Sequence, residues 1–338
     1  MRFDEPLYVS GTGIELAETT TLEAALEAGL CRRATVWRTG VRSVCVSAEL
    51  SGPELAARAA RRALGGAGAG PSDVDLVLHA STYHQGHDLW SAASYVQRES
   101  LGNACPSMEV RQLSNGGLAA VELAAGYLTA APARRHSALV TTGDRFAPPG
   151  FDRFATDPGT ICGDAGTALV LSTVDGFARL VALVTVSDPG LEVMGRGEDP
   201  FSDAPLQARP TIDVGVHRPH LLRSIGMTEM LERMVAGQQE SFRTALDDAK
   251  IDADDVRRFV LPNLGAPKVA AQFLEPLGID PARTTQDWGL GLGHLGAGDQ
   301  IAGLAHLREE GLLASGDHCV LVGAGGGFTW TTAVLEML

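Results

Sequence analysis

The sequence of 338 residues predicts an α/β fold of two pseudo-symmetric halves, with central helices buried between two sheets. The first observation is a repeated order of elements. An amphipathic helical pattern over 51–64 precedes an apolar strand over 74–80, and a helix over 227–249 precedes a strand over 256–261. Because strands that alternate with helices favour parallel or mixed sheets, each half is expected to contain such a sheet.

The second observation is a constant offset between corresponding positions. Two nearly all-apolar helices, 118–128 and 301–307, each follow a glycine-rich step, and two strands, 138–142 and 319–322, each run into a glycine. Those two glycines lie 323 − 143 = 180 residues apart. Helices that are apolar on all sides belong in the interior, so these two are the expected central helices.

The repeat divides the chain into an N-terminal half, 1–174, and a C-terminal half, 175–338. Ser114 and His294 stand just before the two central helices, and their offset is again 294 − 114 = 180. A helix N-terminus offers unpaired N–H groups and a partial positive charge. The pseudo-symmetry therefore predicts that Ser114 and His294 face each other between the halves.

Composition narrows the class of function. The net charge of −14, from 41 acidic and 27 basic residues, does not favour binding to nucleic acid or to anionic membranes. Five scattered cysteines without CxxC spacing predict neither disulfides nor a metal site and indicate a reducing compartment. Because no apolar stretch reaches the length of a signal peptide or a spanning helix, we expect a cytoplasmic protein.

Four segments, in order, resemble the ketoacyl synthase III branch of the thiolase superfamily. They are Arg-Thr-Gly-Val-Arg at 38–42, the stretch 109–117, Gly-Asp-Ala-Gly-Thr-Ala at 163–168, and Gly-Gly-Gly-Phe-Thr-Trp at 325–330. The resemblance covers nearly the whole chain and implies a thiolase-like fold. It also implies that Ser114 stands where the family normally has its cysteine nucleophile.

Two departures from the family pattern affect the chemistry. The family's His-Gln-Ala-Asn motif is replaced by Leu-Pro-Asn-Leu-Gly at 261–265, which contains no histidine, and its Gly-Asn-Thr-Ser motif by Gly-His-Leu-Gly at 293–296. A histidine therefore occupies the place of the asparagine, and Asp299 follows five residues later. The set of Ser114, His294 and Asp299 resembles a subgroup from antibiotic pathways. Its members prime polyketide synthases with unusual starters or transfer acyl groups onto sugars and cyclitols.

The serine increases the need for a base. A serine hydroxyl is a poor nucleophile until a base removes its proton, whereas a cysteine is already partly thiolate. His294 can serve as that base near neutral pH, and Asp299 can orient its ring as in a Ser-His-Asp triad. Asp287 and Asp144 are the alternative orienting residues.

Other site residues are assigned through the resemblance. The backbone N–H groups of Ser114 and Gly327 are expected to form the oxyanion hole. Asn263 is either a contact to the substrate or a turn residue after proline. The further substrate-binding candidates are Trp37 and Arg38, for the nucleotide end of coenzyme A, His84 and His87, for the pocket wall, and Phe328. Two histidines without further ligands do not favour a metal.

The resulting hypothesis is an acyltransferase of secondary metabolism that works through an acyl-serine and needs no cofactor. The donor is the thioester of coenzyme A, of an acyl carrier protein or of a polyketide synthase carrier domain. The acceptor is a hydroxyl or amine of a small natural-product intermediate, and the protein is expected to be a homodimer. A starter-unit condensing enzyme and a non-catalytic partner subunit are the alternatives, and the acyl group, the acceptor and the choice of donor stay open.

Overall fold

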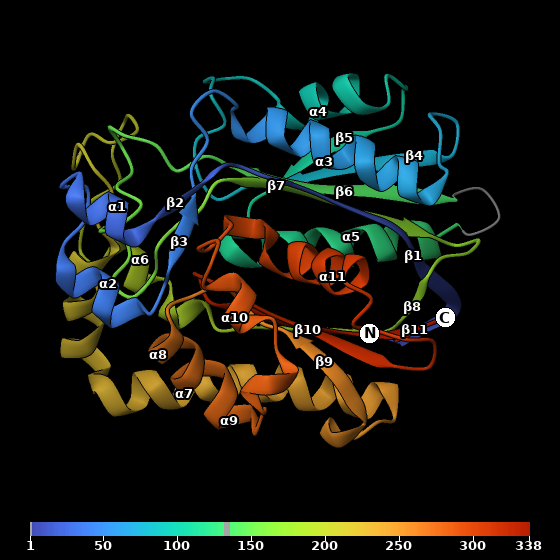
Figure 1. Cartoon of the computed structure of the whole chain (residues 1–338). Helices are drawn as coiled ribbons and strands as arrows, with labels where there is room; N and C mark the ends of the chain where they lie inside the picture. Colours follow the sequence, from blue (N-terminus) through green and yellow to red (C-terminus); the bar gives the residue numbers. More distant parts are fainter. Residues whose placement is uncertain (1, 132–135) are drawn as a thin grey trace.

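The computed structural model describes residues 2–131 and 136–338, and Figure 1 shows their arrangement. Nine strands form one mixed sheet in the order β5-β4-β6-β7-β1-β8-β11-β10-β9. Their bounds are β1 Arg2–Leu16, β4 Val74–Ala80, β5 Ser107–Val110, β6 Ser137–Asp144, β7 Ala165–Ser172, β8 Ala178–Ser187, β9 Val256–Val260, β10 His318–Gly325 and β11 Thr329–Met337. A small second sheet pairs β2 (Thr19–Thr21) with β3 (Ser43–Cys45).

The helices cover and separate the two ends of this sheet. They are α1 Leu22–Glu27, α2 Arg33–Thr39, α3 Gly52–Ala67, α4 Ala92–Ser100, α5 Gly116–Thr129, α6 Val193–Arg196, α7 Arg218–Ala249, α8 Ala266–Val269, α9 Glu275–Leu277, α10 Gln286–Gly289 and α11 Asp299–Glu309. In Figure 1, α5 and α11 lie between the β6–β7 layer and the β9–β10–β11 layer. Helix α3 packs on β1, β6 and β7, and α7 packs on β8 and β11.

The predicted pair of sheets is corrected in one respect, because the two layers are continuous. Strand β1 pairs with β7 on one side and with β8 on the other, and its register shifts between Arg2 and Leu7 and between Val9 and Gly11. Such irregularities bend a strand and increase its twist. The single long β1 thereby passes from one layer to the other, which gives the predicted layered α/β fold with one sheet.

The predicted central helices are confirmed. Leu118, Leu128, Ile301 and Leu304 are buried among strands of both layers in one apolar cluster. Neither α5 nor α11 has a strongly polar face, as expected for central helices, although Leu123 of α5 is 56% exposed. The division of the chain at residue 174 stays a prediction.

The predicted helix over 227–249 is present as the second part of α7. A shorter helical segment that was not predicted precedes it from Arg218, and Gly226 separates the two with φ 80° and ψ 165°. This left-handed conformation is open to glycine at little steric cost, so two helical segments join at a kink there. No helix within the described residues has the length and apolar character that crossing a membrane requires.

Close packing of the central helices leads to a stability prediction. A Cβ atom added at Gly117 of α5 would lie 2.4 Å from the carbonyl oxygen of Ala297. We expect Gly117→Ala to lower the free energy of unfolding by roughly 1–3 kcal/mol, because the backbone of the facing segment must move. Gly126 lies on the same helix, and a Cβ atom added there would meet open space. Gly126→Ala should therefore be neutral or stabilising in the same denaturant titration, and equal losses for both variants would contradict the packing argument.

Candidate active site

Ser114 lies in a tight turn directly before the buried helix α5. The 3-10 helix Leu113–Asn115 follows β5, and Leu113 has φ 48°, which is uncommon for a residue other than glycine. The Asn115 side chain holds the turn, since its Nδ2 donates to Gln112 Oε1 at 2.7 Å and to Thr331 Oγ1 at 2.8 Å. Strained residues of this kind cluster at functional sites because the surrounding structure must fix them. Here the turn leaves Ser114 partly exposed.

Ser114, His294 and Asp299 form a continuous hydrogen-bonded chain. The distance from Ser114 Oγ to His294 Nε2 is 2.8 Å, and that from His294 Nδ1 to Asp299 Oδ2 is 2.6 Å. His294 lies in the loop before the 3-10 helix Gly296–Gly298, and Asp299 is the first residue of α11. The intervening turn brings residues five positions apart into contact, which a straight helix would not do.

Burial and charge oppose each other at His294, which is 6% exposed. Burial alone lowers the pKa of this imidazole, but the charge and hydrogen bond of Asp299 outweigh it, and the net pKa is raised above its usual value. The charge of Asp157 also raises this pKa, and that of Lys268 lowers it. The ring can therefore accept a proton readily, but it is neutral only above this raised pKa.

Backbone donors fix the Asp299 carboxylate, which is 1% exposed. Its Oδ1 accepts from the Leu295 N–H at 2.7 Å, and its Oδ2 accepts from the Asn263 N–H at 2.8 Å. A carboxylate held by several N–H groups keeps its orientation. Asp299 can thus hold the Nδ1–H tautomer of His294, which leaves Nε2 free to accept the serine proton.

The two alternative orienting residues lie elsewhere. Asp287 is at the surface, where its Oδ1 accepts from Arg42 Nη1 at 2.8 Å. Asp144 is fully buried and accepts from the backbone N–H groups of Thr82 and Tyr83. Burial raises the pKa of Asp144 to about 6. Neither carboxylate is hydrogen-bonded to His294.

A cavity of about 550 Å³ opens onto Ser114 and His294. One part of its wall is aromatic: Tyr83 and Phe151 have ring centroids 5.2 Å apart, and Phe146 and Phe151 have centroids 4.8 Å apart. Apolar walls with a few placed polar groups are typical of small-molecule sites. The cavity therefore suits an apolar or aromatic acyl group next to the serine.

The predicted substrate residues divide into two groups. Gly327 and Phe328 line the cavity, and Phe328 also exchanges two backbone hydrogen bonds with Asp188. Asn263, Trp37, Arg38, His84 and His87 do not line it.

For Asn263 the predicted side-chain contact is corrected. The Asn263 side chain is buried and packs closely against Gly289, since a Cβ atom added at Gly289 would lie 2.2 Å from Asn263 Oδ1. Asn263 contributes to the site through its backbone N–H, which donates to Asp299.

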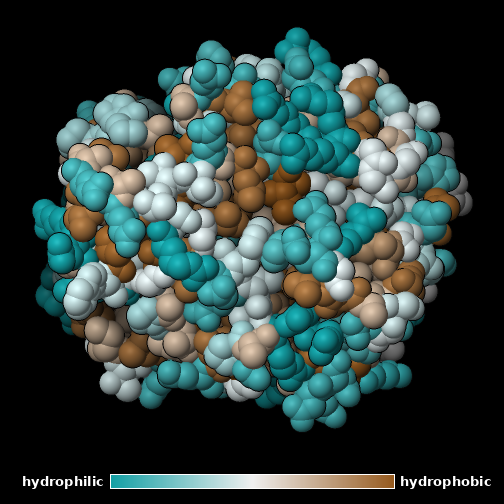
Figure 2. Space-filling model, in the orientation of Figure 1, coloured by the Kyte–Doolittle hydropathy of each residue, from teal (hydrophilic) through white to brown (hydrophobic). Residues whose placement is uncertain are grey.

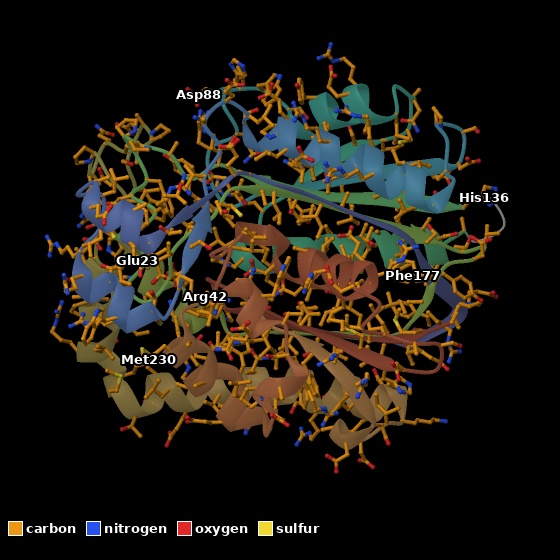
Figure 3. The ribbon with its side chains drawn as sticks, viewed as in Figure 1. Glu23, Arg42, Asp88, His136, Phe177 and Met230 are labelled. Atoms are coloured by element: carbon orange, nitrogen blue, oxygen red, sulfur yellow. The ribbon has the colours of Figure 1, made fainter. Side chains whose placement is uncertain are left out.

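The prediction that His84 and His87, in the loop after β4, line the cavity wall is also corrected. His84 and His87 are exposed, and Figure 3 shows their neighbour Asp88 at the outer edge of the molecule. Thr82 and Tyr83 are the members of this loop that line the cavity. Within the described residues, no group of three or more histidine, cysteine or acidic side chains is arranged to hold a metal ion.

Trp37 and Arg38 lie on the exterior of the neighbouring helix α2. Trp37 is 81% exposed, and α2 packs against α8, which carries the cavity residue Lys268. The two side chains are therefore outside the cavity but near one of its walls, and a role in binding a nucleotide stays a prediction.

Sequence reasoning missed several cavity residues. They are Tyr83, Phe146 and Phe151 of the aromatic wall and the ion pair of Asp157 with Lys268. Cys162 also lines the cavity, but burial raises its pKa well above that of an ordinary thiol, so it stays protonated. The only signal for the aromatic wall is the concentration of Phe and Tyr in two loops, which has no characteristic spacing.

Comparisons with known proteins show which chains this protein is similar to. Residues 246–337 match the family described as the C-terminal part of 3-oxoacyl-[acyl-carrier-protein] synthase III. The β-ketoacyl-[acyl-carrier-protein] synthase III of Rhodospirillum rubrum is 29% identical over 297 residues, which cover 84% of either chain. The solved structure of ChlB3, described as an acyltransferase, is 34% identical, has a TM-score of 0.93 and covers 98% of either chain. The 3-oxoacyl-[acyl-carrier-protein] synthase III of Aquifex aeolicus, with 19% identity and a TM-score of 0.79 over 98% of this chain and 99% of that chain, shares the fold.

Proposed function

Because the chain belongs to the ketoacyl-[acyl-carrier-protein] synthase III family of thiolase-fold enzymes, we propose that it is an acyltransferase whose acyl group is carried by Ser114. The observation that carries this proposal is the hydrogen-bonded chain from Ser114 Oγ through His294 to Asp299, with distances of 2.8 and 2.6 Å. A serine, a base and an orienting carboxylate in this order are the parts that nucleophilic acyl transfer requires.

The first half-reaction forms the acyl-enzyme. Ser114 Oγ attacks the thioester carbonyl while His294 Nε2 takes the hydroxyl proton. The oxyanion is stabilised by the backbone N–H groups of Ser114 and Gly327. When the C–S bond breaks, His294 returns the proton to the leaving thiol.

The second half-reaction passes the acyl group on. The hydroxyl or amine of the acceptor attacks the ester carbonyl, and His294 again takes the proton. As the bond to Ser114 Oγ breaks, the proton returns to the serine, which restores the free enzyme.

Simple transfer is favoured over decarboxylative condensation by the residues at two positions. The stretch 261–265 has no histidine where the family has one, and Asn263 within it does not line the cavity. His294 stands where the family has an asparagine, and it is engaged with Ser114. The pair that would stabilise an enolate after loss of CO₂ is therefore missing, whereas the base for a hydroxyl nucleophile is present.

The donor and the setting follow from the relatives. The family relatives are named for an acyl carrier protein, so we propose a carrier-protein or coenzyme A thioester as donor, with no cofactor. The likeness to ChlB3, described as an acyltransferase, supports acyl transfer. The resemblance of the Ser-His-Asp set to a subgroup from antibiotic pathways leads us to propose a natural-product acceptor of the sugar or cyclitol type in secondary metabolism. This setting is cytoplasmic.

Intact-protein mass spectrometry tests the proposal. The protein is incubated with a panel of short acyl and aryl thioesters, malonyl thioesters included, and the adduct is mapped by peptide analysis. We expect a mass gain on Ser114, none in a Ser114→Ala control, and no CO₂ from malonyl donors. An adduct followed by CO₂ release would indicate the starter-unit condensing enzyme instead. Absence of any adduct or thiol release would leave the non-catalytic partner subunit.

We also propose a homodimer that forms along the edge strand β5. This strand pairs only with β4, and Met108 on it is 49% exposed. Trp90 and Leu89 are exposed as well. They lie near β5, because the Ala92 N–H, two residues after Trp90, donates a hydrogen bond to Glu109 on that strand. Hydrophobic residues occur only in small groups on the face shown in Figure 2. An unpaired, apolar strand edge is suited to pairing with a second copy across a twofold axis.

A charge at the strand edge is expected to separate the subunits. Met108→Lys should convert the dimer to a monomer in light scattering, because two lysines would meet across the axis. Val174→Lys, at a position that is 64% exposed and remote from β5, is the matched control and should leave the dimer intact. A monomeric wild-type protein would contradict the proposal.

A further inference from the structure

The active-site cavity contains an ion pair that neither half-reaction uses. Lys268 Nζ lies 2.8 Å from Asp157 Oδ2 and 2.9 Å from Thr160 Oγ1. The Thr160 hydroxyl in turn donates to Asp157 Oδ2 at 2.7 Å. All three side chains line the cavity, and they come from two segments, the loop between β6 and β7 and the helix α8.

The two segments hold the pair in place. The Gly265 N–H, at the start of α8, donates to the Gly159 carbonyl at 3.1 Å. The side chains of Lys268 and Asp157 are 19% and 28% exposed, so both are largely enclosed but reachable from the cavity. A preformed and partly desolvated polar pair can bind a ligand without first being ordered.

Each partner keeps one unused hydrogen-bonding position. An ammonium group has three N–H donors, and within the described residues Lys268 uses two of them. Asp157 Oδ2 accepts both of its side-chain bonds, whereas Asp157 Oδ1 has no hydrogen-bond partner there. The pair thus offers one donor and one acceptor side by side to a molecule in the cavity.

The charges of the pair select against ionic ligands. Asp157 and Lys268 act on His294 with opposite sign, which places both charges within electrostatic range of the base. An anion that approaches Lys268 would meet the Asp157 carboxylate, and a cation that approaches Asp157 would meet the ammonium. A neutral group that both accepts and donates satisfies the two positions without a charge conflict.

We propose that Lys268 and Asp157 bind a vicinal diol of the acceptor, which rests on the proposed acyltransferase function. One hydroxyl accepts from Lys268 Nζ, and its neighbour donates to Asp157 Oδ1. A further hydroxyl of the same molecule then lies at His294 for acylation. When that hydroxyl attacks, the acceptor O–C bond forms, the Ser114 Oγ–C bond breaks, and the proton moves through His294 Nε2 to Ser114 Oγ.

The test separates the second half-reaction from the first. The acyl-enzyme is formed with an excess of thioester, the donor is removed, and loss of the adduct is followed by intact mass. The probes are myo-inositol, cyclohexane-1,2,3-triol and cyclohexanol, of which the triol carries a vicinal diol in addition to the hydroxyl that is acylated. In the wild type, the triol should remove the acyl group at least about tenfold faster than cyclohexanol, the ratio for one hydrogen bond to a charged group.

Variants of the pair should remove this preference alone. Asp157→Asn and Lys268→Met, singly and combined, are expected to bring the triol-to-cyclohexanol ratio close to one while adduct formation persists. Either substitution also changes the basicity of His294, but this change affects both alcohols equally and therefore cancels in the ratio. Gln272→Leu alters another polar side chain of the same cavity and should keep the ratio.

The outcomes separate this subsite from its rivals. A ratio near one in the wild type, or one unchanged in the variants, would overturn the diol subsite. Slower adduct formation in the variants with an intact ratio would assign the pair to the thioester donor and also overturn it. If the wild type forms no adduct at all, the acyltransferase function itself fails, and the subsite fails with it.

Discussion

Replacement of His294 by alanine is expected to slow acylation of Ser114 on the order of 10⁴-fold. The 2.8 Å contact between Ser114 Oγ and His294 Nε2 provides the only base hydrogen-bonded to that hydroxyl among the described residues. Without it the serine must lose its proton to water, because a hydroxyl has no significant ionised fraction at neutral pH. The rate of adduct formation in rapid-quench mass spectrometry measures the effect.

Two controls make the result specific to the base. Folding of His294→Ala is checked by its unfolding transition, since Asp299 loses a buried partner. In a Ser114→Cys/His294→Ala double variant the nucleophile is a thiol, which is already partly ionised, so acylation should depend far less on the histidine. A His294→Ala variant that acylates within tenfold of the wild type would show that another group activates the serine.

The fold could be predicted from the sequence where the pattern is local and strong. The apolar run of β4, the amphipathic pattern of α3 and the apolar faces of α5 and α11 on all sides predict these elements. The continuity of the sheet through β1 could not be predicted, because it depends on strand pairing between residues about 160 positions apart. The helical segment of α7 before Gly226 was missed, whereas the segment after it agrees with the prediction, because a glycine such as Gly226 is typical of a helix boundary.

The same difference between local and distant contacts decides which parts of the candidate site could be predicted. His294 and Asp299 are five residues apart, so one turn suffices to bring them into contact, and the sequence pattern already places both beside a helix N-terminus. Asp157 and Lys268 are 111 residues apart, and they meet only because the loop between β6 and β7 packs against α8 in the folded chain. The exposed positions of His84 and His87 likewise depend on how one loop turns, which side-chain identity does not determine.

Asp299→Asn is expected to reduce acylation roughly 10²- to 10⁴-fold while Ser114 and His294 stay in place. An asparagine amide has one acceptor oxygen, but three donors face the two oxygens of Asp299: His294 Nδ1–H and the backbone N–H groups of Leu295 and Asn263. If the amide nitrogen faces Nδ1, it donates to that atom and selects the Nε2–H tautomer, which cannot accept the serine proton. If it faces Leu295 instead, two N–H groups oppose each other in a buried site.

The pH dependence of acylation gives this prediction a second readout. In the wild type the pKa of His294 is raised above its usual value, because the charge and hydrogen bond of Asp299 outweigh burial. The base is active only when neutral, so the acylation rate should fall as the pH drops through that raised pKa. Without the negative charge, burial dominates and lowers the pKa of His294. The fall of the acylation rate at acidic pH (the acid limb) should therefore move to lower pH in Asp299→Asn, although the maximal rate at higher pH (the plateau) is lower than in the wild type.

The matched control is Asp287→Asn, which removes an exposed carboxylate close to Asp299 in the sequence. Asp287 pairs with Arg42 at the surface and makes no contact with His294, so both the plateau and the acid limb should stay at their wild-type values. A plateau that falls in Asp299→Asn without movement of the limb would mean that the carboxylate only supports the fold of its loop. A limb that moves in Asp287→Asn as well would mean that net charge, and not the contact at Nδ1, sets the basicity of His294.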